Sequence, residues 1–232
     1  MVSSPQLILD LAQPEPPSLH NFVVGANGEA VATLRALAGA TLPHPGVLLW
    51  GVPGGGKSHL VEAVIALARA AGRGFVVCGA SNDPPEPEHI PTGALIVVDD
   101  MDGIGASGQA RLFTLVNALP AQGGQWLATT KLPPARLALR DDLRTRLALG
   151  LVLEVVPLAD ADKPAALAAY ARERGFALSD DVIMYLLAHA RRDMKSLVAT
   201  LAALDRHSLA AKRNVTVPLL REWLQHGLGL PR

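Results

Sequence analysis

The sequence predicts an α/β domain built on a parallel sheet, followed by a small domain made only of helices. Three observations support this prediction. Short apolar runs alternate with segments of helical periodicity as far as Pro157, an alternation typical of parallel strands joined by helical crossovers. A glycine-rich stretch follows the first apolar run and precedes a helical segment. After Pro157 helical periodicity continues without apolar runs between the segments, which places a domain boundary there.

The elements of the α/β part follow from apolar spacing and from turn formers. Four prolines interrupt the first 20 residues, which are expected to form a tail. The apolar spacing of Val31, Leu34 and Ala38 predicts a first helix from Glu29 to Leu37. Residues 83–87 are rich in proline and are expected to form a loop. Buried strands are expected at 46–50, 75–78, 94–98 and 125–130, and further helices at 57–71 and 109–119.

The second domain is expected to be a small helical bundle. Gly175 and the segment 214–216 separate its periodic stretches. The expected helices cover 160–174, 179–190, 193–211 and 218–226. The chain is therefore expected to consist of a tail at 1–20, an α/β base domain at 21–157 and a helical lid domain at 158–232.

Composition excludes several classes of protein. The chain has 232 residues, with Lys+Arg 21 and Asp+Glu 21, so no excess of positive charge favours nucleic-acid binding over the whole surface. Its one cysteine, Cys78, permits neither an intrachain disulfide nor a cysteine zinc site and is expected to be buried in a strand. No signal peptide or membrane-length apolar run is evident, which predicts a cytoplasmic protein without membrane contact.

The strongest motif is G-x-x-x-x-G-K-[ST] at residues 51–58, between a predicted strand and a predicted helix. Its glycines let backbone N–H groups face a phosphate, and the helix adds the positive end of its dipole. Lys57 is expected to contact the β- and γ-phosphates and Ser58 to hold Mg²⁺. The alternative is a glycine-rich turn with a solvated lysine. The expected nucleotide contacts here are Gly51, Pro53, Gly54, Gly55, Gly56, Lys57, Ser58 and His59.

Two carboxylates, Asp99 and Asp100, follow the third predicted strand. Open parallel sheets bind ligands at the carboxyl ends of their strands. Asp99 is therefore expected to support Mg²⁺, and Asp100 to orient or deprotonate a water. An acid pair in a turn is the alternative. Because aspartate is one methylene shorter than glutamate, any hydrolysis by this chain alone is expected to be slow.

Further polar residues are candidates with structural alternatives. Thr130 or Lys131, at the end of the fourth strand, is expected near the γ-phosphate unless this is an ordinary strand end. Arg146 is a candidate arginine finger or a solvated arginine near a helix end. Arg192 precedes Asp193 at a helix start, where an arginine is unfavourable. This position indicates an anionic partner, or else a surface pair with Asp193.

The tail contains one short apolar string, Gln6-Leu7-Ile8-Leu9-Asp10-Leu11. It has too few apolar residues to fold alone, but it can dock as an extended peptide through main-chain bonds and alternate side chains. The alternative is a segment that packs on its own domain. The expected partner-binding residues are Gln6, Leu7, Leu9 and Leu11.

These motifs together resemble the AAA+ ATPases, and their details resemble the DnaA branch. The segment 21–25 is similar to the one that lines the adenine there, so the resemblance implies this role for Val23 and Val24. The sequence Gly-Lys-Ser-His-Leu at 56–60, the Asp-Asp strand end and Arg192 followed by an acid also agree. The chain has no room for the helix-turn-helix domain of an initiator, so no sequence-specific DNA binding is expected. With its tail and the stretch 204–218, it resembles the Hda family of DnaA-like regulators.

The Hda resemblance implies a function and its partners. Such a protein binds ADP or ATP with Mg²⁺, docks on the sliding clamp of DNA polymerase through a tail like Gln6 to Leu11, and inactivates DnaA. Arg146 would reach ATP held by DnaA, and Arg192 would sense the chain's own nucleotide. Lys131 departs from the pattern, since related chains often carry an acid there. The intact phosphate loop is compatible with weak intrinsic ATPase activity. The resemblance is also compatible with a homodimer.

Two other functions remain open on the sequence alone. One is a self-sufficient AAA+ ATPase that acts as a helicase-loader-like or DNA-remodelling factor. The other is a nucleotide-dependent adaptor without catalysis. The tail distinguishes the clamp-dependent regulator of DnaA from a helicase loader, because only the regulator needs Gln6 to Leu11. Arg146 separates it from the adaptor, which would regulate normally without this arginine.

Overall fold

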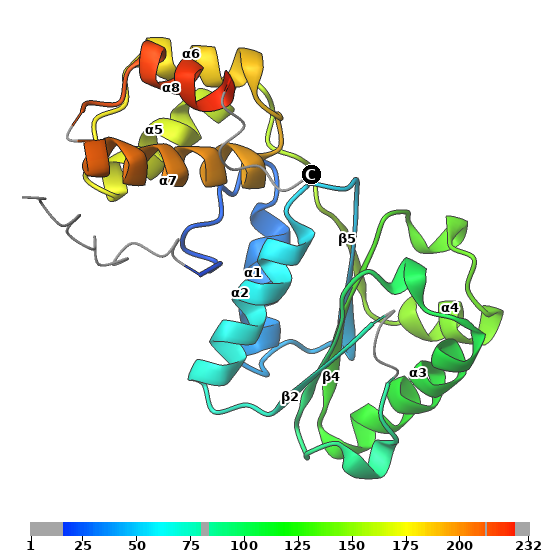
Figure 1. Cartoon of the computed structure of the whole chain (residues 1–232). Coiled ribbons are helices and arrows are strands. Elements are labelled where there is room, and N and C mark those ends of the chain that lie inside the picture. The colour runs from blue at the N-terminus through cyan, green and yellow to red at the C-terminus, as the bar shows by residue number, and fades with distance from the viewer. Residues whose placement is uncertain (1–15, 80–83, 212, 226–232) are drawn as a thin grey trace, which may run out of the picture. The chain divides into compact units, whose positions relative to one another are not determined.

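The computed structural model describes residues 16–79, 84–211 and 213–225. Its contacts divide the chain into two units, one at Pro17–Leu158 and one that takes in the residues from Ala159 onward. The first unit is an α/β layer structure and the second is helical (Figure 1). The predicted fold class is therefore confirmed.

Five parallel strands form the sheet in the described part of the first unit, in the order β2-β3-β4-β1-β5. Four of them lie where the apolar runs predicted strands. The fifth, β5, was not predicted. It pairs with β1 at the edge of the sheet and leaves Val152 39% exposed, so it lacks the continuous burial that marks a central parallel strand. The strands are β1 (Gly46–Trp50), β2 (Phe75–Cys78), β3 (Leu95–Val98), β4 (Gln125–Thr130) and β5 (Leu151–Glu154).

Helices cover both faces of this sheet (Figure 1). Helices α1 (Gly28–Ala38) and α2 (Lys57–Ala70) pack on one face, and α3 (Ala106–Ala118) and α4 (Asp141–Leu147) pack on the other. Strand side chains alternate between the two apolar cores, as they must in a pleated sheet. Leu49, Val97 and Leu127 join the α1 and α2 side, whereas Leu48, Ile96 and Trp126 join the α3 and α4 side.

Helix α3 begins three residues earlier than the expected start at Gln109. The side-chain amide of Gln109 donates to the carbonyl of Ile104 at 3.1 Å. Gln109 therefore lies within the first turn of α3 and ties it to the preceding segment, instead of being the first residue of the helix. Pro120 converts the end of the helix to a 3-10 turn at Leu119–Gln122. Further 3-10 turns lie at Pro87–His89, Met101–Gly103 and Pro134–Arg136.

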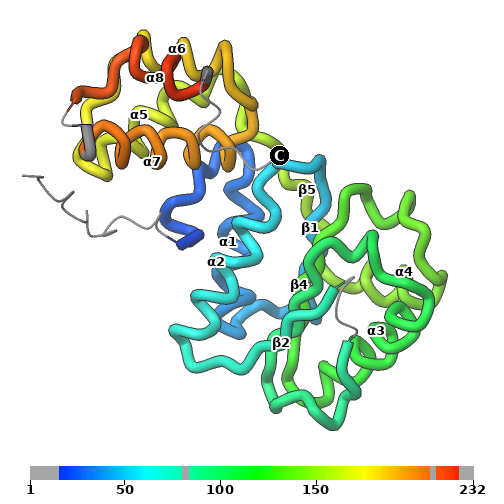
Figure 2. The backbone as a smooth tube through the Cα atoms, in the orientation of Figure 1, coloured from blue at the N-terminus to red at the C-terminus, as the bar shows by residue number. Residues whose placement is uncertain are grey.

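The second unit contains α5 (Lys163–Glu173), α6 (Asp180–His189), α7 (Met194–Ala211) and α8 (Val217–Gln225). Figure 2 traces these four helices as a bundle, and all four predicted helices are present within a few residues. Their core is built mainly from leucines that are less than 2% exposed, such as Leu167, Leu186, Leu201 and Leu220. None of the helices in the described residues could cross a lipid bilayer.

Cys78 is buried at the end of β2, as predicted, with 2% of its surface exposed. Burial disfavours the thiolate and raises the pKa of the thiol to about 11. A thiol with such a pKa is a poor nucleophile at neutral pH. Cys78 is therefore part of the core rather than a reactive group.

Gly46 to alanine is expected to destabilise the first unit by about 1–3 kcal/mol, the usual cost of overpacking. A Cβ on Gly46 would lie 2.2 Å from Cδ2 of Trp126, the residue opposite it in the β1–β4 pair. Trp126 is 1% exposed, so it has no space to move away. Urea unfolding measures the change. Gly28 to alanine is the matched control, because nothing lies within 4 Å of a Cβ there, and an equal loss in both variants would contradict the packing argument.

Candidate functional site

The loop at residues 51–58 connects the end of β1 to the start of α2. Gly51 and Gly56 have φ angles of 153° and 103°. A Cβ would lie 2.5 Å from the carbonyl oxygen of Val155 at Gly51, and 2.8 Å from the Phe22 ring at Gly56. The loop path therefore requires glycine at both positions.

The amides of this loop are available to a ligand. Among the described residues, the N–H groups of Gly54, Gly56, Lys57 and Ser58 have no hydrogen-bond acceptor. Helix α2 has no acidic residue in its first turn. Consecutive free amides at the positive end of a helix form an anion site. The loop therefore fits a phosphate chain.

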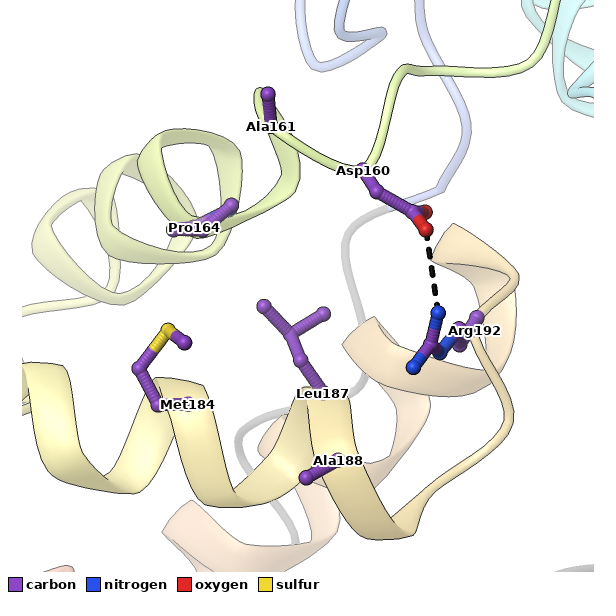
Figure 3. A pocket seen from close by; sticks show the side chains of 7 residues that line it. All are labelled: Asp160, Ala161, Pro164, Met184, Leu187, Ala188 and Arg192. Atoms are coloured by element: carbon purple, nitrogen blue, oxygen red, sulfur yellow. Dashed lines mark hydrogen bonds and ion pairs between the residues drawn. The ribbon is translucent and has the colours of Figure 1, made fainter.

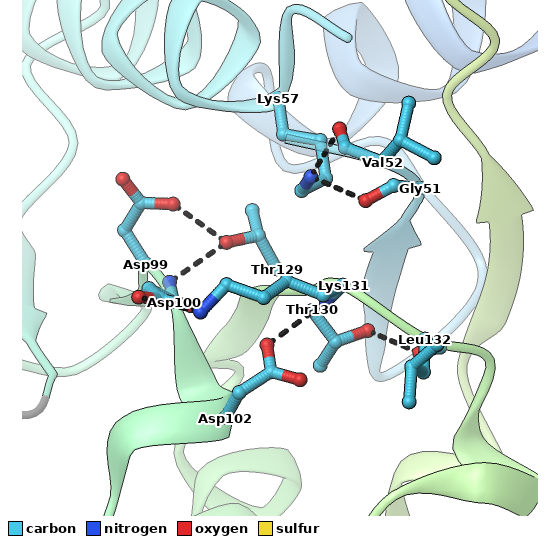
Figure 4. A network of polar contacts seen from close by, with 10 residues as sticks. All are labelled: Gly51, Val52, Lys57, Asp99, Asp100, Asp102, Thr129, Thr130, Lys131 and Leu132. Atoms are coloured by element: carbon cyan, nitrogen blue, oxygen red, sulfur yellow. Dashed lines mark hydrogen bonds and ion pairs between the residues drawn. The ribbon is translucent and has the colours of Figure 1, made fainter. Parts of the chain in front are cut away.

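The Lys57 side chain folds back over this loop (Figure 4). Its ammonium donates to the carbonyl of Gly51 at 2.6 Å and to that of Val52 at 3.1 Å. Partial burial lowers the pKa of Lys57, and nearby carboxylates, Asp102 first, counteract this. A phosphate entering the loop would exchange two neutral carbonyls for an anion, which is the stronger partner of an ammonium.

The carboxyl ends of β3 and β4 meet beside the loop. Thr129 on β4 donates its hydroxyl to Asp99 at 2.6 Å and accepts the N–H of Asp100 at 2.8 Å. Thr129 is 1% exposed, so its buried hydroxyl holds the side chain of Asp99 and the backbone of Asp100 in place. Thr129 was missed by the sequence analysis. The position of Thr129 near the end of a strand indicates a residue near the site. Only the β3–β4 pairing shows that Thr129, and not the adjacent Thr130, faces Asp99.

Thr130 and Lys131, the two candidates near the γ-phosphate, differ in what they contact. Thr130 is fully buried and donates its hydroxyl to the carbonyl of Leu132 at 2.8 Å. The side-chain ammonium of Lys131 lies 3.0 Å from the Asp100 carboxylate. The backbone N–H of Lys131 donates to the Asp102 carboxylate at 2.9 Å. Of the two, only Lys131 extends toward the aspartates.

Two oxygen-bearing side chains at this edge of the sheet, Ser58 and Asp99, could hold a Mg²⁺ ion together with a bound phosphate. Ser58 exposes its hydroxyl in the first turn of α2, and Asp99 keeps one carboxylate oxygen free of the Thr129 hydrogen bond. The described residues contain no cluster of three His, Cys, Asp or Glu placed to hold a metal. Phosphate oxygens and water would therefore supply most ligands, as Mg²⁺ prefers.

The segment before α1 packs against the loop through Phe22. The Phe22 and His59 rings lie 5.4 Å apart, and Nε2 of His59 lies 3.0 Å from the carbonyl oxygen of Ser18. Val23 and Val24 remain 40% and 39% exposed. These two valines thus leave apolar surface beside the phosphate loop, where a base could lie.

The segment before α1 is held in place by Asn27. The Asn27 side chain exchanges two hydrogen bonds with the backbone of Val156, at 2.9 and 2.8 Å. Asn27 is only 4% exposed. This paired contact fixes the start of α1 to the segment that follows β5. No local motif indicates it, because the two residues are 129 positions apart.

Arg146 lies in the last turn of α4 and is exposed. The other arginines here are engaged: Arg140 pairs with Asp142 at 2.7 Å, and Arg144 pairs with Asp141. Arg146 has no ion pair within the described parts of the chain. Of these three arginines, it is the one that can reach another molecule without breaking an ion pair.

The helical unit has an open hollow of about 360 Å³ beside Arg192 (Figure 3). Pro164, Met184 and Leu187 give it an apolar lining. Arg192 pairs with Asp160 at 3.3 Å rather than with Asp193, which pairs with Arg191 at 3.6 Å. The surface pair considered for Arg192 with Asp193 is therefore wrong.

Asp160 and Asp193 have separate roles around Arg192. Asp160 also accepts from Lys163 at 2.6 Å, and the two cations, Lys163 first, lower its pKa. Asp193 accepts the N–H of Ser196 at 2.9 Å and so caps the start of α7. Arg192 therefore precedes α7 instead of opening it. Gln6, Leu7, Leu9 and Leu11, the expected partner-binding residues, lie outside the described residues.

The chain is similar to one known family over part of its length and to solved structures in its fold. Residues 160–224 match the family model for the lid domain of Hda. Domain III of the replication initiation protein DnaA from Thermotoga maritima has a TM-score of 0.71 at 17% identity, with 93% of this chain and 98% of that chain covered. AMPPCP-bound DnaA from Aquifex aeolicus gives 0.67 at 20%, with 84% and 66% covered.

The fold extends beyond the initiators. The RuvB Holliday junction branch migration motor from Thermotoga maritima has a TM-score of 0.69 at 15% identity, with 93% of this chain and 73% of that chain covered. The fold is thus shared with replication and recombination proteins, whereas the family-model match covers residues 160–224. The first unit and the helices that follow thus have the fold of DnaA domain III, and residues 160–224 are similar to the lid domain of Hda.

Proposed function

We propose that this protein is a negative regulator of replication initiation that acts on DnaA. It binds an adenine nucleotide in the loop at residues 51–58, docks on the sliding clamp through Gln6 to Leu11, and presents Arg146 to ATP held by DnaA. Hydrolysis there would convert DnaA–ATP to DnaA–ADP and suppress re-initiation. The Hda lid and the DnaA-like fold support a DnaA-related regulator.

Nucleotide binding rests on one observation above all, the free amides of Gly56, Lys57 and Ser58 at the start of α2. DnaA of Aquifex aeolicus, which shares this fold, was solved with AMPPCP. Lys57 would hold the β- and γ-phosphates in place of its two loop carbonyls. Val23 and Val24 would contact the base. His59 would support them through its contact with Phe22, which precedes them in the chain.

The remaining site residues take complementary roles. Ser58 and Asp99 would hold Mg²⁺, which when bound neutralises phosphate charge. Asp100 would orient or deprotonate a water for slow intrinsic hydrolysis. Arg192, in the helical unit, would leave Asp160 for a phosphate, because both members of that pair are more than 60% exposed and such a pair is weak.

Arg146 is the proposed arginine finger because it is exposed and unpaired within the described part of α4, while Arg140 and Arg144 are engaged. A guanidinium placed on the γ-phosphate of a neighbouring subunit neutralises charge that develops in the transition state. The last-turn position also leaves the side chain free to extend beyond the helix.

Deletion of residues 6–11 is expected to abolish clamp binding and clamp-dependent turnover of DnaA–ATP. The string is the segment with the alternation that peptide docking requires. Binding to clamp-loaded DNA and hydrolysis of labelled ATP on DnaA measure the two effects. Nucleotide binding by the deletion variant is the control, since the loop at 51–58 is untouched. Full DnaA–ATP turnover by the deletion variant would instead favour a clamp-independent ATPase.

A further inference from the structure

The end of α4 carries an exposed leucine beside the proposed arginine finger. Leu149 is 55% exposed, the highest value among the large apolar side chains in the described residues of the first unit. Its backbone N–H donates to the carbonyl of Arg146 at 3.2 Å, so the two residues belong to one turn. A single apolar side chain on a surface is ordinary, and Leu149 is informative because of what holds and surrounds it.

The turn that presents Leu149 is packed closely on the core. The N–H of Gly150 donates to the carbonyl of Leu147 at 3.1 Å, and Leu147 is 1% exposed. A Cβ at Gly150 would lie 2.6 Å from the Trp126 ring, so the backbone here lies directly against that buried ring. The turn therefore has a fixed path, and that path leaves the Leu149 side chain at the surface.

The surroundings of Leu149 are apolar apart from the arginine. Residues 145–152 include one charged side chain, that of Arg146. Val152 on β5 is 39% exposed and pairs with Leu48, which belongs to the core on the α3 and α4 side. Because residues paired in register point to the same side of a sheet, Val152 lies on the side that α4 covers. We call Arg146, Leu149 and Val152 the α4–β5 surface.

The composition of the α4–β5 surface favours one kind of partner. The centres of protein interfaces combine apolar anchors with arginine and are poor in other charged residues. Within the described residues the guanidinium of Arg146 has no ion pair, so it is complementary to an anion. The partner that fits therefore presents an anionic group bordered by apolar surface. A protein chain that holds a nucleoside triphosphate at its edge has this chemistry.

We propose that Leu149 is the apolar anchor through which the α4–β5 surface docks on the ATP-holding face of DnaA, and that this docking brings Arg146 to the γ-phosphate. The inference rests on the proposed function, because it requires Arg146 to act on a partner. Leu149 touches no reacting atom and is a positioning residue. Its apolar contact does not respond to charge that develops at phosphorus, so it stabilises the docked complex and the transition state equally.

Leu149→Ala is expected to raise the KM for DnaA–ATP about tenfold and to leave kcat unchanged, because it removes apolar burial that contributes equally to both states. DnaA–ATP is titrated against a small fixed amount of the full chain on clamp-loaded DNA. Leu149→Met should keep a near-normal KM, since it keeps the apolar volume. Leu67→Ala is the matched control, because Leu67 is an exposed leucine on α2, on the other face of the sheet. Both of its constants should stay normal.

Other results separate this inference from the proposed function. An unchanged KM in Leu149→Ala, with turnover reduced in Arg146→Ala, would overturn the inference alone, because the finger would reach DnaA without this anchor. A higher KM with a lower urea midpoint of unfolding would assign Leu149 to folding and overturn it too. Weaker self-association in sedimentation, with an unchanged KM, would assign the surface to a second copy of this chain instead of DnaA. Normal turnover by Arg146→Ala would overturn both the proposed function and the inference.

Discussion

Arg146→Ala is expected to lower the DnaA–ATP turnover that this protein stimulates by about 10³-fold, because an arginine finger contributes at least that much in well-studied cases. The chain's own nucleotide affinity should not change, since Arg146 is exposed on α4 and lies outside the loop at 51–58. Release of labelled phosphate from DnaA, with clamp-loaded DNA present, measures the effect.

Arg35→Ala is the matched control for this experiment. Arg35 is also an exposed arginine in the last turn of a helix, α1, so its loss removes the same charge in a similar setting. Near-normal stimulation is expected from it. If Arg146→Ala stimulated DnaA as well as the unmodified protein, the arginine-finger mechanism would be wrong and a non-catalytic adaptor would be favoured.

Lys57→Ala is expected to weaken ADP and ATP binding by about 100-fold, because charge-assisted hydrogen bonds contribute roughly 1.5–3 kcal/mol each. The Lys57 ammonium lies at the loop, 2.6 Å from the carbonyl oxygen of Gly51 and 3.1 Å from that of Val52. Calorimetric titration with each nucleotide measures the loss. If the bound nucleotide is needed for the active form, stimulation of DnaA should fall in parallel.

Arg69→Ala tests whether the loss in Lys57→Ala is specific to the site. Arg69 lies on the same helix, α2, but in its last turn, where it stacks on Phe75 at 5.2 Å. Its removal changes the net charge equally and leaves the phosphate loop intact. Equal weakening in both variants would mean that general charge, and not the Lys57 position, controls binding.

Much of the fold was predictable because each central strand is buried on both faces. The central strands β1, β3 and β4 appear as apolar runs, and so does the edge strand β2, whose four residues are all apolar although Val77 is 42% exposed. The other edge strand, β5, was missed because its apolar run is shorter, Leu151–Leu153, and ends at the exposed Glu154. The same reasoning explains the helices, whose apolar stripes predicted their existence better than their ends.

The site divides in a similar way. The phosphate loop is local, so eight consecutive residues carry the whole signal. Thr129 contacts Asp99 across about 30 positions of sequence, and the Lys131–Asp100 pair spans a similar distance. Such contacts depend on which strands are neighbours and on their register, and neither is fixed by local spacing. Asp160 was missed as a partner of Arg192 because 32 positions separate the two residues, and only the packing of the helices that follow them brings them together.

Titration of the purified chain with ADP and ATP, with and without clamp-loaded DNA, tests the central claim most directly. Saturable binding of one nucleotide per chain, weakened about 100-fold in Lys57→Ala and unchanged in Arg146→Ala, is the predicted result. Absence of saturable binding by the unmodified chain under both conditions would contradict the claim that the loop at 51–58 holds an adenine nucleotide.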